Sequence, residues 1–109
     1  MYSTLIVARM NLNVAAEVTN IFERFDRTEM PDIMGTRRRQ LFSFHGLYFH
    51  LQDFDSDEGG EAIEEVRTHP LFTGVSSDLR PYIEPYDPAT WRSPKDAMAE
   101  RFYYWSKVD

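Results

Sequence analysis

One stretch, residues 36–54 with the sequence TRRRQLFSFHGLYFHLQDF, constrains the fold more than any other part of the chain. Polar and apolar side chains alternate along it on both sides of His45 and Gly46. Histidine and especially glycine tolerate the positive φ that a tight hairpin turn requires. The stretch therefore predicts a β-hairpin with its turn at these two residues. The cross-strand pairs expected from this turn are Phe44 with Leu47, Phe42 with Phe49, Leu41 with His50, and Arg39 with Gln52.

The alternation also sorts the hairpin side chains onto two faces, because successive residues of a strand point to opposite sides of a sheet. One face is apolar and the other is mostly polar. The arginine triplet is split, so that Arg38 points away from Arg37 and Arg39. His50 becomes the diagonal neighbour of Arg39, about 7–8 Å away between backbones. The polar face is expected to carry Arg37, Arg39, Leu41, Ser43, Tyr48, His50 and Gln52, and the apolar face Phe42, Phe44, Leu47, Phe49 and Leu51.

The rest of the chain predicts further strands and helices. Residues 3–10, STLIVARM, are mostly β-branched or apolar and predict a strand. Residues 14–25 carry one apolar stripe at helical spacing, and Pro31 is expected to end this segment. Later elements are expected to be a helix around 62–66, a short helix at 75–82, a proline-rich loop at 84–94 over the surface or a pocket, and an aromatic last strand at 100–106.

The element order β-α-β-β-α-β predicts a ferredoxin-like α+β fold. At 109 residues the chain is expected to form a single domain spanning residues 1–109. Two helices would cover one face of the sheet and leave the other face open. Because that open face is rich in aromatic side chains, it predicts a partner, and a homodimer formed sheet to sheet is the simplest one.

Charge and composition argue against several classes of function. A net charge of −6 argues against nucleic acid as a partner, because phosphate binding normally needs a basic surface. Without cysteine there is no disulfide or thiolate chemistry, and three histidines without metal-ligand spacing predict no metal site. The first apolar stretch, residues 5–8, is too short for a signal peptide or a membrane span. We therefore expect a cytoplasmic protein that does not act at a membrane.

Several segments resemble the aromatic polyketide cyclases of the tetracenomycin F2 cyclase type. They are GTRRRQLFSFHGLYFHL, RTHPLF and AERFYYWS, with MNLN before the first helix and FDRTEMP at its end, so the resemblance spans nearly the whole chain. It implies a dimeric α/β barrel of ferredoxin-like subunits that needs no metal or organic cofactor. It also implies the function: regiospecific aldol cyclisation, dehydration and aromatisation of a poly-β-ketone or partly cyclised intermediate in bacterial aromatic polyketide biosynthesis. That intermediate would arrive either free or on an acyl carrier protein.

The same resemblance implies a catalytic set of His50, Arg39 and Asp26. A histidine that titrates near the working pH suits general acid/base catalysis, and the fork of an arginine can hold an enolate or diketone oxygen pair. The acidic residue would orient the histidine or hold a substrate hydroxyl. A member of the family has a histidine at the position of Phe25, so a mechanism that uses it does not apply to this chain. The predicted substrate-binding residues are Tyr48, Phe22, Phe25, Ser43 and Tyr104.

The sequence also leaves simpler interpretations open. Arginine and histidine on one strand face can form a solvated surface with weak ion pairs, and Arg39 can pair with Asp26 or Glu29 for structural reasons alone. His45 is interpreted as a turn residue and His69 as a helix cap or packing residue. Two further functions remain as hypotheses. One is a cofactor-free oxygenase of anthrone-like or quinol-like substrates, which rests on fold analogy alone. The other is a binder that templates folding of the polyketide without chemistry.

Overall fold

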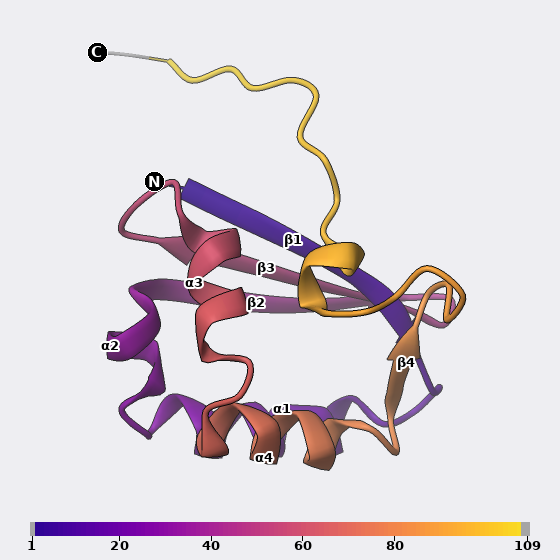
Figure 1. The fold of residues 1–109 in the computed structure, drawn as a ribbon. Coiled ribbons are helices and arrows are strands. Elements are labelled where there is room, and N and C mark those ends of the chain that lie inside the picture. Colours follow the sequence, from indigo (N-terminus) through magenta and orange to yellow (C-terminus); the bar gives the residue numbers. More distant parts are fainter. Residues whose placement is uncertain (1, 108–109) are drawn as a thin grey trace.

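The computed structural model describes residues 2–107 and contains one four-stranded antiparallel sheet with its main helices on one side (Figure 1). The strand order is β2-β3-β1-β4. This arrangement confirms the predicted ferredoxin-like α+β class, whereas the predicted dimer stays a prediction. The elements are β1 (Tyr2–Met10), α1 (Ala15–Asp26), α2 (Met30–Met34), β2 (Thr36–Phe44), β3 (Leu47–Phe54), α3 (Gly59–Val66), α4 (Pro70–Leu79), β4 (Ile83–Pro85) and the 3₁₀-helix η1 (Pro94–Ala97).

The β2–β3 hairpin forms with the predicted turn and register. His45 and Gly46 both have positive φ, 48° and 82°, which is the geometry of a two-residue hairpin turn whose twist matches its strands. The turn fixes the register of the two long strands, and this register decides which side chains face the helices. The predicted pairs Phe44–Leu47, Phe42–Phe49, Leu41–His50 and Arg39–Gln52 are all present.

The arginine triplet is divided among three carboxylates. A β-bulge between Thr36 and Arg38 interrupts the alternation, because the bulged strand has one residue more than its partner. Arg37 therefore does not join the face of Arg39 as the alternation predicted, and its exposed side chain pairs elsewhere. The three ion pairs are Arg37–Asp55 at 3.4 Å, Arg38–Asp53 at 2.8 Å and Arg39–Asp26 at 2.9 Å.

The core lies between the sheet and the helices. The predicted apolar stripe on α1 is buried through Val18, Ile21, Phe22 and Phe25. The expectation that Pro31 ends the helical segment is wrong, because a second short helix, α2, carries this proline in its first turn. The first turn of a helix needs no backbone N–H from its residues, so proline is tolerated there.

The last strand is β4 (Ile83–Pro85), and this corrects the strand predicted at residues 100–106. β4 pairs with the end of β1, whereas residues 99–107 form neither strand nor helix and run away from the sheet (Figure 1). Four aromatic side chains of this segment are exposed. Aromatic residues raise β-propensity only where a sheet offers them a surface to pack on, and none of the described elements does so here. The four side chains are those of Phe102, Tyr103, Tyr104 and Trp105.

The helix α4 begins earlier than predicted, at Pro70 instead of Val75. His69 is its N-cap, and the ring Nδ1 accepts a hydrogen bond from the backbone N–H of Leu71 at 3.1 Å. This confirms the interpretation of His69 as a helix-cap residue. No helix among residues 2–107 has the length and apolar character that crossing a membrane requires. The cytoplasmic location stays a prediction.

The sheet face turned away from α1 and α4 remains open in the described chain (Figure 1). Phe42 and Phe44 on this face are 52% and 63% exposed. Leu5 and Val7 of β1 lie on the same face, because they pair with Leu51 and Phe49 of β3, which project away from the buried His50. The open face therefore carries an apolar patch that runs across three strands, with Gln40 and the Arg38–Asp53 ion pair toward one end of it.

Candidate active site

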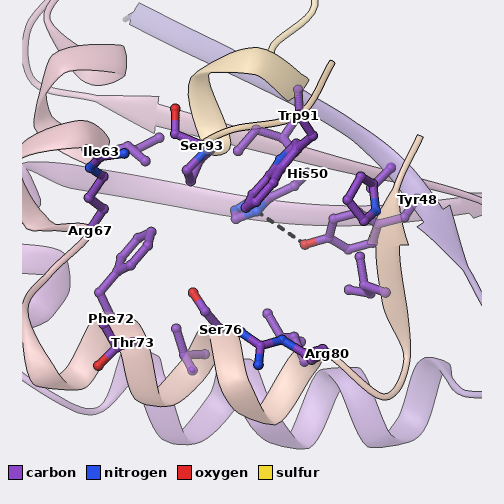
Figure 2. A pocket seen from close by; sticks show the side chains of 18 of the residues that line it. Tyr48, His50, Ile63, Arg67, Phe72, Thr73, Ser76, Arg80, Trp91 and Ser93 are labelled. Atoms are coloured by element: carbon purple, nitrogen blue, oxygen red, sulfur yellow. Dashed lines mark hydrogen bonds between the residues drawn. The ribbon is translucent and has the colours of Figure 1, made fainter. Parts of the chain in front are cut away.

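A cavity of about 850 Å³ lies between the sheet and α4 (Figure 2). Its volume falls in the range of roughly 300–1,000 Å³ that is usual for small-molecule sites. Strands β1 and β3, helices α1, α3 and α4, and the predicted loop at 84–94 all contribute to its wall. Its apolar lining, which suits a flat multi-ring ligand, comprises Ile6, Ala8, Phe22, Phe25, Met34, Ile63, Phe72, Val75, Leu79, Ile83, Pro85, Trp91, Pro94 and Ala97.

A hydrogen-bond network centred on Arg39 forms the polar part of the wall. The Arg39 side chain is only 7% exposed, and its Nε and Nη2 both donate to Oδ1 of Asp26, at 3.1 and 2.9 Å. Its Nη1 donates to Nε2 of His50 at 2.8 Å and to Oε1 of Gln52 at 3.2 Å. Gln52 in turn donates from Nε2 to the hydroxyl of Thr36 at 2.7 Å. The buried guanidinium is therefore held by groups from α1 and β3.

Two phenylalanines of α1 flank the Arg39 guanidinium. Its central carbon lies 5.1 Å from the ring centroid of Phe22 and 5.5 Å from that of Phe25. Both rings are buried and meet edge to face, with 6.4 Å between their centroids. The negative ring faces attract the cation, and the rings also keep water from it. Phe25 therefore packs against the arginine and offers no group beside Asp26 that could transfer a proton.

The partners of His50 determine which of its nitrogens carries the proton. Arginine only donates hydrogen bonds, so Nε2 of His50 must accept the bond from Arg39. A neutral imidazole that accepts at Nε2 has its proton on Nδ1. This Nδ1–H donates to Oη of Tyr48 over 3.2 Å, along the dashed line in Figure 2. The Tyr48 hydroxyl accepts that bond and keeps its own proton for an acceptor in the cavity.

Burial keeps both of these side chains neutral, and the neighbouring cation adds to this effect for His50 alone. The pKa of His50 falls from 6.5 to about 3, mainly because burial disfavours the imidazolium and secondly because Arg39 repels it. Burial raises the pKa of Tyr48 well above its usual value, although Arg39 opposes the shift. The expectation that His50 titrates near the working pH therefore does not hold in this environment. At neutral pH the site presents an uncharged histidine and a protonated tyrosine.

The structure brings most of the predicted site residues together, but not all of them. Phe22, Phe25 and Tyr48 line the cavity with Arg39 and His50. Asp26 does not line it; its half-exposed carboxylate holds Arg39 from outside. Two predicted substrate-binding residues lie elsewhere: Ser43 is exposed in a small depression beside the hairpin turn, and Tyr104 is 64% exposed on the C-terminal segment.

The wall formed by α4 was not anticipated from the sequence. Thr73, Ser76 and Arg80 line the cavity from α4 and its C-cap, and Trp91 and Ser93 line it from the loop (Figure 2). The three α4-region residues follow one another at spacings of 3 and 4, which is the signal of a single helix face. That signal was missed because the helix was predicted to begin at Val75. Among residues 2–107, no cluster of three or more histidine, aspartate or glutamate side chains is arranged to hold a metal ion.

The chain matches the family model for polyketide synthesis cyclases over residues 2–106. The protein belongs to this family. The match extends over the cavity, the Arg39 network and the C-terminal segment. The predicted family and the predicted enzyme class, a polyketide cyclase, are thereby confirmed.

Relatives and a solved structure agree with this assignment. Tetracenomycin F2 cyclase from Streptomyces glaucescens is 42% identical over 108 residues, covering 99% of this chain and 97% of that protein. Its solved structure, described as that of a type-II polyketide cyclase, matches with a TM-score of 0.91 at 41% identity, covering 99% of this chain and 100% of that chain. Polyketide synthase CurG from Streptomyces cyaneus is 38% identical over 107 residues, covering 98% of this chain and 99% of that protein. An uncharacterised protein from Streptomyces coelicolor is 46% identical over 109 residues, covering 99% of this chain and 97% of that protein.

Proposed function

We propose that this cyclase closes a ring of an aromatic polyketide intermediate by intramolecular aldol condensation, followed by loss of water and aromatisation. The observation that carries the mechanism is the neutral His50, held between Arg39 and Tyr48. The family membership supports the reaction class. The apolar cavity supports a flat, partly cyclised substrate, because such a wall forces one folded conformer on a flexible chain.

In this proposal Tyr48 is the group that touches the reacting oxygen. Its hydroxyl proton is free to donate to a ketone or enolate oxygen, and its neutral state is maintained by burial. His50 is a positioning residue, because both of its ring nitrogens are already engaged. Arg39 has one Nη2–H without a partner among residues 2–107, and this donor is available to a second oxygen of the substrate, on the other side of the His50 ring from Tyr48. Asp26 and Gln52 hold the arginine in place.

The reaction balances within the substrate. A carbon between two carbonyl groups loses a proton, and the resulting enolate carbon forms a bond to a ketone carbon of the same chain. The ketone oxygen accepts a proton, so no proton is consumed in total. The new hydroxyl then leaves as water with a proton of the adjacent carbon. Donors fixed at the oxygen stabilise the negative charge that develops there, which is worth about 10²–10³ in rate for one such donor.

Replacing Tyr48 with phenylalanine tests the mechanism, because this change removes the hydroxyl and keeps the ring. With a partly cyclised 1,3-diketone substrate followed by chromatography, we expect kcat to fall about 10²–10³-fold in Tyr48→Phe, with KM changed only a few-fold. Tyr86→Phe is the matched control, because that tyrosine is exposed and lies outside the cavity lining. Running free and carrier-bound substrate in parallel decides how the substrate is delivered.

Three outcomes of this experiment would contradict the proposal. A Tyr48→Phe rate within a few-fold of the wild type would favour a binder that templates folding without chemistry. Consumption of oxygen in step with product would favour the cofactor-free oxygenase. A product distribution identical to that of the substrate without protein would remove the cyclase assignment itself for this substrate.

We infer in addition that the protein works as a homodimer in which the open sheet faces meet. The exposed Phe42 and Phe44 support this inference, because monomers seldom leave such a patch uncovered. Sedimentation velocity at micromolar concentration should show a dimer, and Phe44→Glu should shift it toward a monomer. Ile33→Glu is the control, since Ile33 is 51% exposed and lies on α2, outside the sheet. A monomeric wild type would contradict the inference.

A further inference from the structure

We propose that Arg80 anchors a carboxylate of the substrate on the α4 wall of the cavity, across from Tyr48 and His50. Arg80 is the C-cap residue of α4, and Figure 2 shows its guanidinium group directed into the cavity below the His50 ring. This inference rests on the proposed function and adds a substrate class to it: an aromatic polyketide that bears a free acid group.

The charges around the cavity support an anionic ligand. The protein has a net charge of −6, yet four arginines and one glutamate line this cavity. Arg39 is neutralised by Asp26 at 2.9 Å, and Arg67 lies 3.7 Å from Glu64. Arg80 and Arg92 belong to none of the ion pairs formed by the residues that the structure describes, and Arg80 is the one on the α4 wall beside Ser76. The cavity therefore keeps a local positive charge in an acidic protein.

A neutral ligand would leave this charge without a partner. Arg80 is exposed to water in the free protein, and a flat ligand that fills the cavity would cover part of its guanidinium group. Covering a cation costs free energy, and a carboxylate on the same ligand offsets that cost. The planar fork of an arginine matches the two oxygens of a carboxylate, and such charge-assisted hydrogen bonds are stronger than neutral ones. A positive side chain at a helix C-terminus also interacts well with the helix dipole, but that interaction does not require the side chain to point into a cavity.

Ser76 adds a second polar group at the same place. It stands four residues before Arg80, one turn earlier on the same side of α4, and both residues line the cavity (Figure 2). No side-chain hydrogen bond joins the Ser76 hydroxyl to another described residue, so it can donate to a carboxylate oxygen held by Arg80. The cavity then has polar groups on two opposite walls: Tyr48 binds the reacting carbonyl, and Arg80 binds the acid group.

Binding of a non-reactive probe tests the anchor without any turnover. The probes are anthracene-2-carboxylic acid and its neutral amide, which have the same flat ring system. In a Trp105→Phe background, Trp91 is the sole tryptophan and lines the cavity, so quenching of its fluorescence reports entry of the probe. We expect the acid to bind about ten-fold more tightly than the amide, as one exposed charge-assisted pair allows. In Arg80→Gln this preference should disappear, and Arg80→Lys should keep part of it.

Arg67→Gln is the matched control, because Arg67 lines the same cavity but already has a carboxylate neighbour. It should keep the preference of the wild type for the acid. The proposal is overturned if Arg80→Gln retains the ten-fold ratio, or if the wild-type protein binds acid and amide equally. Either result leaves the cyclase mechanism untouched, because the assay reads binding alone and Tyr48 is not altered.

Discussion

Lowering the pH should destabilise the folded protein through His50. The folded state keeps this imidazole neutral, with a pKa of about 3 against 6.5 when it is free of the fold. Between these two values the unfolded chain binds a proton that the folded protein does not. The free energy of unfolding therefore falls as the pH drops below 6.5. Replacing His50 with glutamine removes the titration while keeping a side chain that can accept a hydrogen bond from Arg39.

The size of the effect follows from the two pKa values. Each pH unit within the window between them is worth about 1.4 kcal/mol. From pH 7.5 to pH 5.0 the wild-type protein should lose about 2 kcal/mol more than His50→Gln, which is a shift of roughly 1 M in the urea midpoint. Asp53 does not affect this comparison between pH 7.5 and pH 5.0. A hydrogen bond from Ser3 lowers the pKa of its carboxyl below 3.8, so its contribution to the free energy of unfolding is lost only at more acidic pH.

Urea denaturation followed by far-UV circular dichroism, at one protein concentration, gives both free energies at both pH values. His45→Gln is the matched control, because it removes an exposed histidine from the hairpin turn. Its loss between the two pH values should equal that of the wild type. If His50→Gln loses as much stability as the wild type between pH 7.5 and 5.0, then His50 is not held neutral by the fold and the hydrogen-bond assignment is wrong.

Two further substitutions test the packing and the network. Gly59→Ala should lower the free energy of unfolding by about 1–3 kcal/mol, because a Cβ there would lie 2.3 Å from the Phe54 ring. In Gly60→Ala the nearest atom would be 3.6 Å away, so this variant should stay close to the wild type in the same urea titration; equal losses would refute the contact. Asp26→Asn should reduce kcat/KM about ten-fold by loosening Arg39, and unchanged kinetics would show that the half-exposed carboxylate does not position it.

The hairpin part of the site could be predicted because its geometry is local. A strand has a period of two residues, so the position of the turn alone places Arg39, Tyr48 and His50 on one face. The pairing of Arg39 with Asp26 was one of the open alternatives, since it depends on where α1 lies across the sheet. The pKa of His50 could not be predicted for the same reason. It depends on burial and on a charged neighbour, and the alternation of polar and apolar residues indicates neither.

The second half of the cavity is built by segments with weak local signals. β4 has three residues and ends in proline, which is too short for an alternating pattern to be recognised. The aromatic residues at 100–106 have high β-propensity, yet β4 already pairs with the end of β1. The polar face of α4 includes Thr73, which a helix beginning at Val75 would leave out, whereas α4 begins at Pro70. High β-propensity thus predicted a strand at residues 100–106 that does not form, and the weak pattern of α4 left the cavity wall unpredicted.

The hydrogen-bond chain through the imidazole has a consequence for how the family can diverge. The ring of His50 is satisfied only by a neighbour that donates on one side and a neighbour that accepts on the other. A relative without Arg39 would leave the buried Nε2 lone pair of His50 without a hydrogen-bond donor. A relative without Tyr48 would leave the buried Nδ1–H without an acceptor. Each loss costs about 1–3 kcal/mol of stability. Positions 39, 48 and 50 should therefore change together among relatives, as one inherited unit, even where the surrounding apolar wall adapts freely to a new ring system.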